Sequence, residues 1–168
     1  MFEVLVFVYE NYWRGDACPE SHQLSRKLSA VGFEADEIEQ ALTWLEGLNF
    51  AAQSVRPADV EDHRQEPAHD APAALPCSSD SLRVYSVAEQ DHLGAQCLGF
   101  VSFLESSGVL PAPMREIVID RAMASPGDPV SLEDLKIIIL MVYWSFGQEP
   151  DALVLDELCD DRRQRVAH

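Results

Sequence analysis

Residues 24–48 of this chain read LSRKLSAVGFEADEIEQALTWLEGL, and this stretch decides the fold. Leu24 and Leu28 are four residues apart, which places both on one face of a helix. Gly32 follows, and a glycine is favoured where a helix ends in a left-handed residue. Phe33 can then pack back on the preceding turn. The pattern predicts two amphipathic helices hinged at Gly32 and Phe33, which is a helix-turn-helix arrangement.

The second of these helices is predicted to begin near Asp36 and to bury one face. Its apolar residues recur at helical spacing, whereas acidic residues and Gln40 occupy the other side. This apolar face, the first helix and the later apolar segments are together predicted to form a hydrophobic core. The residues expected in this core are Leu24, Leu28, Phe33, Ile38, Leu42, Leu45, Phe100, Leu104 and Leu140.

The first thirteen residues carry an aromatic and apolar stripe at spacings of three and four, which favours a helix. Three valines in the same stretch also suit a strand. Aromatic side chains concentrate at the centres of protein interfaces, and core packing is the alternative interpretation. The interface candidates are Tyr9, Tyr12, Trp13, Tyr143, Trp144 and Phe146.

The C-terminal part is predicted to be helical as well. Ser86 and Glu89 have the spacing of a capping box, in which each side chain binds a free amide at the helix start. A further helix is expected to start at Pro111 or Pro113. Residues 137–144 are apolar on every side, which is typical of a helix in the middle of a core or in an assembly interface.

Residues 51–81 are rich in proline, alanine and acids, which predicts a flexible insert. On its two sides, residues 50–55 and 82–86 look strand-like and can pair as a short two-stranded wing. We therefore expect a mainly α protein with a winged-helix-like N-terminal part. Its predicted parts are a three-helix unit (1–50), the insert (51–81), a helical unit (82–159) that contains a last short helix (151–159), and a charged tail (160–168).

The net charge of the chain is −17, from 29 acidic and 12 basic residues. Such a surface repels nucleic acids and anionic lipid, and it favours basic partners. The longest apolar run, residues 137–144, is far shorter than the roughly 20 residues of a membrane span. No basic flank precedes the first apolar stretch, and the four cysteines lie far apart. These features predict a cytoplasmic protein with reduced thiols and no membrane segment.

Two patterns could carry chemistry, and neither predicts it. Glu89 and His92 match half of a carboxylate-bridged di-iron motif, but the matching pair in the insert, Glu66 and His69, is interrupted by a proline. Glu116 and Asp120 are one helical turn apart, as in an acid–base pair, but adjacent arginines favour a surface ion-pair cluster. We therefore expect no enzyme activity, no metal site and no cofactor.

A helix-turn-helix suggests DNA binding through its second helix. Here that helix carries four acidic residues and neither lysine nor arginine. Phosphate contacts need positive charge, so direct binding to nucleic acid is not expected.

The chain resembles the Smg family of bacterial proteins, whose biochemical function is uncharacterised. The resemblance extends over nearly the whole chain, apart from the insert. The matching residues include Met1-Phe2-Glu3-Val4-Leu5, Gly32-Phe33, Trp44-Leu45, Arg83-Val84-Tyr85, Gly99-Phe100, Val118-Ile119-Asp120-Arg121 and Leu132-Glu133-Asp134-Leu135-Lys136. It implies a mainly helical bacterial protein. Genes of family members tend to lie near genes of DNA processing, which is an association only.

From these features we expect a non-catalytic adaptor or regulator that binds another protein, and the net charge favours a basic partner. The alternative function is a nucleic-acid-associated helix-turn-helix regulator linked to DNA processing. The third hypothesis is an enzyme. The sequence leaves a homo-oligomer open.

Overall fold

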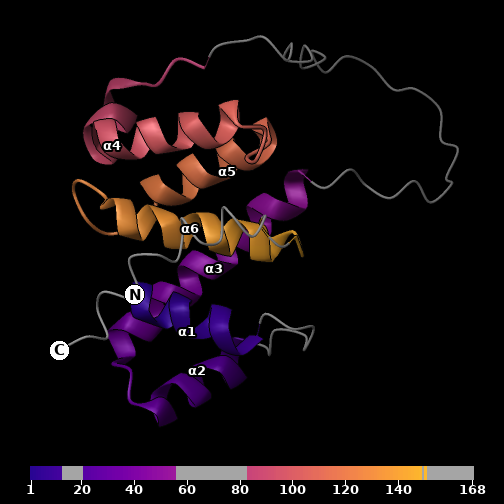
Figure 1. Ribbon diagram of the computed structural model, residues 1–168. Helices are drawn as coiled ribbons and strands as arrows, with labels where there is room; N and C mark the ends of the chain where they lie inside the picture. Colours follow the sequence, from indigo (N-terminus) through magenta and orange to yellow (C-terminus); the bar gives the residue numbers. More distant parts are fainter. Residues whose placement is uncertain (13–20, 56–82, 149, 151–168) are drawn as a thin grey trace, which may run out of the picture.

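The computed structural model describes residues 1–12, 21–55, 83–148 and 150, and within these ranges the chain is mainly helical (Figure 1). This confirms that the protein is mainly α, but it does not confirm the winged-helix-like part of the prediction. The described ranges contain helices and no strand. The helices are α1 (Phe2–Tyr12), α2 (Ser21–Val31), α3 (Ala35–Val55), α4 (Val87–Ser106), α5 (Ala112–Met123) and α6 (Leu132–Ser145).

Helix α6 is the centre of the molecule. It contacts α1 and α3 on one side and α4 and α5 on the other, and Figure 1 shows it between these two groups. Ile138, Ile139, Met141 and Val142 are all completely buried. The apolar run predicted to lie in a core or an interface therefore joins the N-terminal and C-terminal helices into one core.

Helices α2 and α3 form a hairpin whose turn falls at Gly32, as predicted. Gly32 has φ 111°, and its N–H and that of Phe33 both donate to the Leu28 carbonyl, at 3.2 and 3.3 Å. This bonding ends α2 and turns the chain into α3. The Phe33 ring then packs edge-on against Phe7 of α1, with 5.7 Å between ring centres. The hairpin is thereby attached to α1.

Helix α4 begins at the predicted capping box and is broken near its middle. The Ser86 hydroxyl accepts from the Glu89 N–H, and the Glu89 carboxylate accepts from the Ser86 N–H. Gly94 has φ 66°, which interrupts the helix. At this break the His92 carbonyl accepts a 2.8 Å bond from the Val130 N–H. The α5–α6 loop is therefore held against α4.

The predicted two-stranded wing is wrong, because residues 50–55 belong to α3. The helix continues to Val55, so the boundary expected at residue 50 falls inside it. Ala52 is buried while Phe50 is 75% exposed, which is the pattern of one helix face. Two consecutive alanines favour the helix here over the strand that Phe50 and Val55 suggested. Residues 83–86 form no regular structure.

Several predicted segments lie outside the described residues: Trp13, the insert at 56–81, the helix expected at 151–159 and the tail at 160–168. None of the helices in the described ranges is both long and apolar enough to cross a membrane.

Candidate interaction surface on helix α3

The outward face of α3 is polar and acidic along its first half. The buried positions are Ile38, Ala41, Trp44, Leu45, Leu48 and Ala52. Between them, Asp36, Glu39, Gln40, Thr43 and Glu46 are exposed. The helical period thus separates the residues of α3 into a core face and a solvent face, and neither face contains a lysine or arginine.

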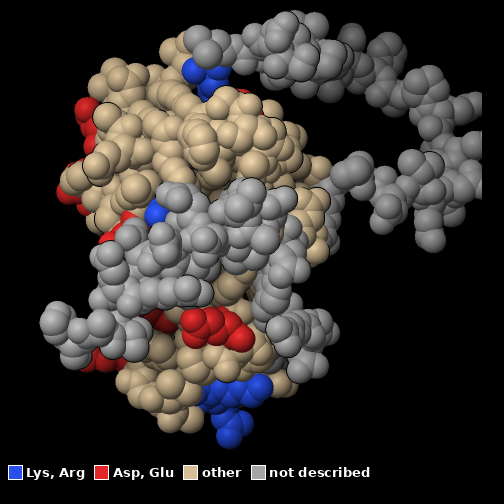
Figure 2. All heavy atoms as spheres, in the orientation of Figure 1, with Lys and Arg blue, Asp and Glu red and all other residues tan. Residues whose placement is uncertain are grey.

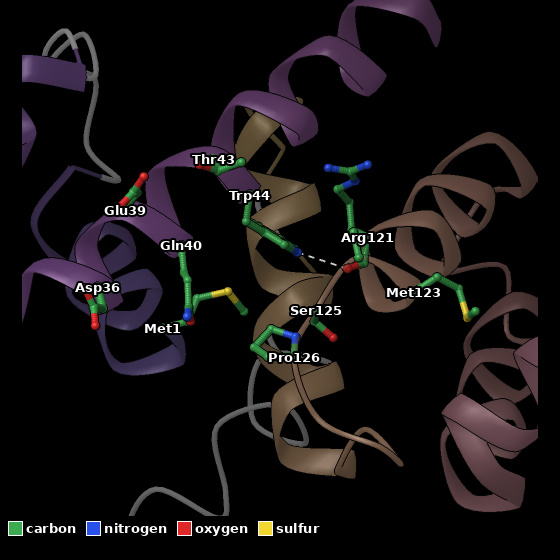
Figure 3. A pocket seen from close by; sticks show the side chains of 11 residues that line it. Met1, Asp36, Glu39, Gln40, Thr43, Trp44, Arg121, Met123, Ser125 and Pro126 are labelled. Carbon is green, nitrogen blue, oxygen red and sulfur yellow. Dashed lines mark hydrogen bonds between the residues drawn. The ribbon is translucent and has the colours of Figure 1, made fainter.

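One hollow of about 700 Å³ lies between α3 and residues 121–126, and we call it the α3–α5 hollow (Figure 3). Asp36, Glu39 and Gln40 line it from α3. Met123 and Pro126 line it from the opposite side. The indole N–H of Trp44 crosses between the two sides and donates to the Arg121 carbonyl at 3.0 Å, as the dashed line in Figure 3 shows.

A second hollow, of about 360 Å³, lies between α3 and α2, and we call it the α2–α3 hollow. Ser25 and Ser29 line it from α2, and Leu42 and Glu46 line it from α3. Glu39 and Thr43 line both hollows. The two hollows are therefore the two sides of a single ridge formed by the exposed face of α3.

Two cations line the α3–α5 hollow, and both charges are already paired. The first is the Met1 ammonium, which lies 3.4 Å from Glu37 Oε1. The second is Arg121. Its Nε and Nη2 atoms donate to Asp120 Oδ2 at 2.9 and 2.7 Å. Its Nη1 atom lies against Gly47, where a Cβ would come within 1.9 Å of it. A glycine in the middle of α3 thus leaves room for the guanidinium. Among the described residues, Asp36 and Glu39 form no ion pair. When Glu37 and Asp120 are counted with the two cations that they pair, the charge around the hollow is negative.

The exposed basic residues of the N-terminal helices lie elsewhere. Figure 2 shows basic atoms gathered at the α2 end of the molecule, and the basic residues of α2 are Arg26 and Lys27. Lys27 Nζ lies 5.3 Å from the centre of the Tyr12 ring. The hollows on α3 therefore face solvent with acidic groups, and α2 carries the positive charge.

The two carboxylates that suggested acid–base chemistry are each paired with arginine. Asp120 pairs with Arg121, and Glu116 belongs to a separate ion-pair network. Arg83 binds Glu89 at 2.7 Å and Glu116 at 2.9 Å. Arg115 binds Glu116 at 2.7 Å and also pairs with Glu105. The network attaches residues 83–86, α4 and α5 to one another. Each of these acids is paired with an arginine, as expected for a surface ion-pair cluster.

His92, which belongs to the half di-iron motif, contacts other residues of the protein through both ring nitrogens. Its Nε2 atom lies 3.2 Å from the Ala122 carbonyl, and its Nδ1 atom lies 3.8 Å from Asp128. Glu89 is occupied by Arg83 and Ser86. Within the described ranges, no three His, Cys, Asp or Glu side chains are close enough together to hold a metal ion.

The five aromatic interface candidates within the described residues do not form one free surface. Tyr143 is buried, and its hydroxyl donates to the Val109 carbonyl. Tyr9, Tyr12, Trp144 and Phe146 are partly buried and pack against the core. Of the residues expected in the core, Leu24, Leu28, Ile38, Leu45, Leu104 and Leu140 are buried, and Phe33, Leu42 and Phe100 pack against it with part of each side chain exposed.

The residues that sequence reasoning missed are those on the far wall of the α3–α5 hollow. Arg121, Met123 and Pro126 come from α5 and the loop after it, far from α3 in the chain. No local pattern marks them, because only the packing of α5 against α3 brings them there. A glycine inside a strong helical pattern, Gly47, was the one available signal of a close approach.

The Glu89 carboxylate makes the stability of the protein depend on pH. Arg83 lowers the pKa of Glu89 from 4.5 to about 2, and the Ser86 N–H contributes to the same shift. Because the pKa is lower in the folded state, this stabilisation is complete above pH 4.5 and is lost as the pH falls toward 2.

We expect Glu89→Gln to lower the free energy of unfolding by about 1–3 kcal/mol at neutral pH, since charged hydrogen bonds contribute amounts of this order. The variant should also lose stability less steeply than the wild type between pH 4.5 and 2. Urea denaturation across this pH range measures both effects. Asp91→Asn, at an exposed position on the same helix, is the control and should retain the wild-type slope. A Glu89→Gln profile parallel to the wild type would contradict the assignment.

Comparison with known proteins gives relatives over the full length of the chain. A family model described as "Protein of unknown function (DUF494)" matches residues 1–168. The chain is 60% identical to the Protein Smg homolog of Methylibium petroleiphilum, 59% to that of Leptothrix cholodnii and 48% to that of Bordetella pertussis. Each of these alignments covers 100% of both chains. No solved structure matches the chain significantly.

Proposed function

Since the chain belongs to the Smg family of bacterial proteins, we propose that it is a cytoplasmic, non-catalytic adaptor or regulator that binds a protein partner with a basic surface. One observation carries this proposal. The exposed face of α3 is acidic, contains no base, and has a hollow on each side. Hollows give a partner side chain a place to pack, and unpaired carboxylates select a partner of positive charge.

The charge of the whole chain supports the same partner. With a net charge of −17, the protein attracts basic surfaces over distances set by the salt concentration. The screening length is about 30 Å at 0.01 M salt and about 3 Å at 1 M. The affinity of such a complex is expected to fall as the salt concentration rises, mainly because the association rate constant decreases.

The test is purification of the tagged full chain from its native bacterium at low and high salt, with quantification of the proteins that accompany it. We expect a basic protein in near-stoichiometric amount at low salt and its loss at high salt. Glu39→Lys should abolish its recovery, because Glu39 lines both hollows. Asp91→Lys makes the same charge change on α4 and is the matched control. Recovery that is equal for both variants would overturn the proposal.

The alternative regulator that binds nucleic acid predicts a different result. In that case, α3 would enter the major groove and face phosphates with Asp36, Glu39 and Glu46. A gel-shift titration of duplex DNA at low salt separates the two functions. The adaptor proposal expects no shifted band at micromolar protein, and a specific shift that Glu39→Lys alters would favour the alternative.

A further inference from the structure

We infer that the α3–α5 hollow is the part of this surface that takes the partner, and that its occupant is a peptide segment in which lysine or arginine alternates with apolar residues. This inference rests on the proposed function and names the site and the ligand chemistry within it.

The sign of the ligand charge follows from the pairing of the two cations in the lining. Glu37 Oε1 lies 3.4 Å from the Met1 ammonium, and Asp120 binds Arg121. Two nitrogens of Arg121 are held by Asp120 Oδ2, and the third lies against Gly47, so this guanidinium is not offered to an incoming anion. On the opposite wall, Asp36 and Glu39 are exposed and form no ion pair among the described residues. A cation entering the hollow therefore meets two carboxylates that have no counter-ion among the described residues, whereas both cations of the lining already have one.

The wall opposite α3 suggests that the ligand also carries apolar side chains. Met123 lines this wall and is 37% exposed. Pro126 also lines this wall, and Figure 3 shows it near the Met1 side chain, whereas the Met123 side chain points away from α3. Lysine and arginine place a long methylene stem on such surfaces while the charged end reaches a carboxylate. An adjacent leucine-sized side chain can cover Met123.

The size and hydrogen-bonding groups of the hollow suit a peptide. Its volume of about 700 Å³ is within the range of about 300–1,000 Å³ that holds drug-sized ligands. Gln40 and Thr43 line it on the α3 side and supply an amide and a hydroxyl. An extended segment can use both groups for its backbone while its side chains alternate between the acidic and the apolar wall.

The probes are three acetylated peptide amides, Arg-Leu-Arg-Leu, Gln-Leu-Gln-Leu and Glu-Leu-Glu-Leu, titrated into the labelled full chain at low salt. Nuclear magnetic resonance reports the position of binding, because the Trp44 indole N–H crosses the hollow. Trp44→Phe identifies its signal among those of the three tryptophans. We expect the arginine peptide to shift the Trp44 indole and Gln40 signals, the glutamine peptide to bind at least about tenfold more weakly, and the glutamate peptide to leave the signals unchanged.

Two charge reversals on the same helix locate the site. Asp36 lines only the α3–α5 hollow and Glu46 lines only the α2–α3 hollow, so Asp36→Lys and Glu46→Lys make the same change on different sides of the ridge. We expect Asp36→Lys to weaken the arginine peptide by about tenfold or more and Glu46→Lys by less than about threefold. Met123→Ala should weaken it as well, with Val87→Ala, at an exposed apolar position on α4, as the control.

The outcomes separate this inference from the proposed function. Signal shifts confined to Ser25 and Ser29, or equal effects of the two reversals, would overturn the α3–α5 hollow as the site and leave the adaptor function standing on the purification result. No binding of the arginine peptide at low salt would overturn the inference as well. Failure to recover a basic partner at low salt in the purification experiment, with peptide binding intact, would overturn the proposed function alone.

Discussion

Replacement of Trp44 by alanine is expected to lower the free energy of unfolding by about 3–5 kcal/mol, the range for large aromatic side chains removed from a core. Trp44 is 4% exposed and lies where α3 packs against α5. The variant loses the apolar contacts of the indole and leaves a cavity between the two helices. It also leaves the Arg121 carbonyl without the indole donor.

Two further variants separate these contributions. Trp44→Phe keeps most of the apolar burial and removes the hydrogen bond, so we expect a loss of about 1–3 kcal/mol. Thr43→Ala changes an exposed neighbour on the same helix and should cost less than about 0.5 kcal/mol. Chemical denaturation curves with a common slope compare all three. A Trp44→Ala loss no larger than that of Thr43→Ala would show that the contact between α3 and α5 does not hold the fold.

Trp44 also illustrates how much of the fold the sequence predicts. The spacing of Leu24, Leu28, Ile38 and Leu45 is local information, and it is sufficient to predict α2, the turn at Gly32 and α3. The caps at Ser86 and Ser131 are also local, since each hydroxyl accepts from an N–H only three residues away. Features determined within one or two helical turns were therefore predictable.

The failed prediction at residues 50–55 has a physical explanation. A short stretch with an aromatic residue at one end and a valine at the other has no clear period of its own. The chain continues as a helix because Leu48 and Ala52 lie one turn apart and both are buried. That burial depends on helices distant in the sequence, so propensity alone could not decide between helix and strand.

The α3–α5 hollow was predictable only in part. Its acidic wall follows from the solvent face of α3, which the pattern of Glu39, Gln40 and Thr43 indicates. Its apolar wall follows from the position of Met123, which depends on how α5 crosses α3. The crossing angle of two helices depends on how their surfaces pack together. The local pattern of a single sequence therefore does not predict it.

The second large effect is expected at Ile139, which is completely buried in α6. Ile139→Ala should lower the free energy of unfolding by about 2–5 kcal/mol. Ile137, two residues earlier on the same helix, is only partly buried, and Ile137→Ala should cost less than half as much. The pair holds side-chain chemistry and helix propensity constant, so the difference measures burial alone.

Ile139→Ala also tests whether the two groups of helices unfold together. Because α6 packs against α1 and α3 on one side and α5 on the other, neither group keeps its core once α6 is displaced. We therefore expect one calorimetric transition in the wild type and one, at lower temperature, in the variant, with agreement between the calorimetric and van't Hoff enthalpies. Two transitions, of which only one moves in the variant, would show that the helices on the two sides of α6 are separate folding units and that α6 belongs to only one of them.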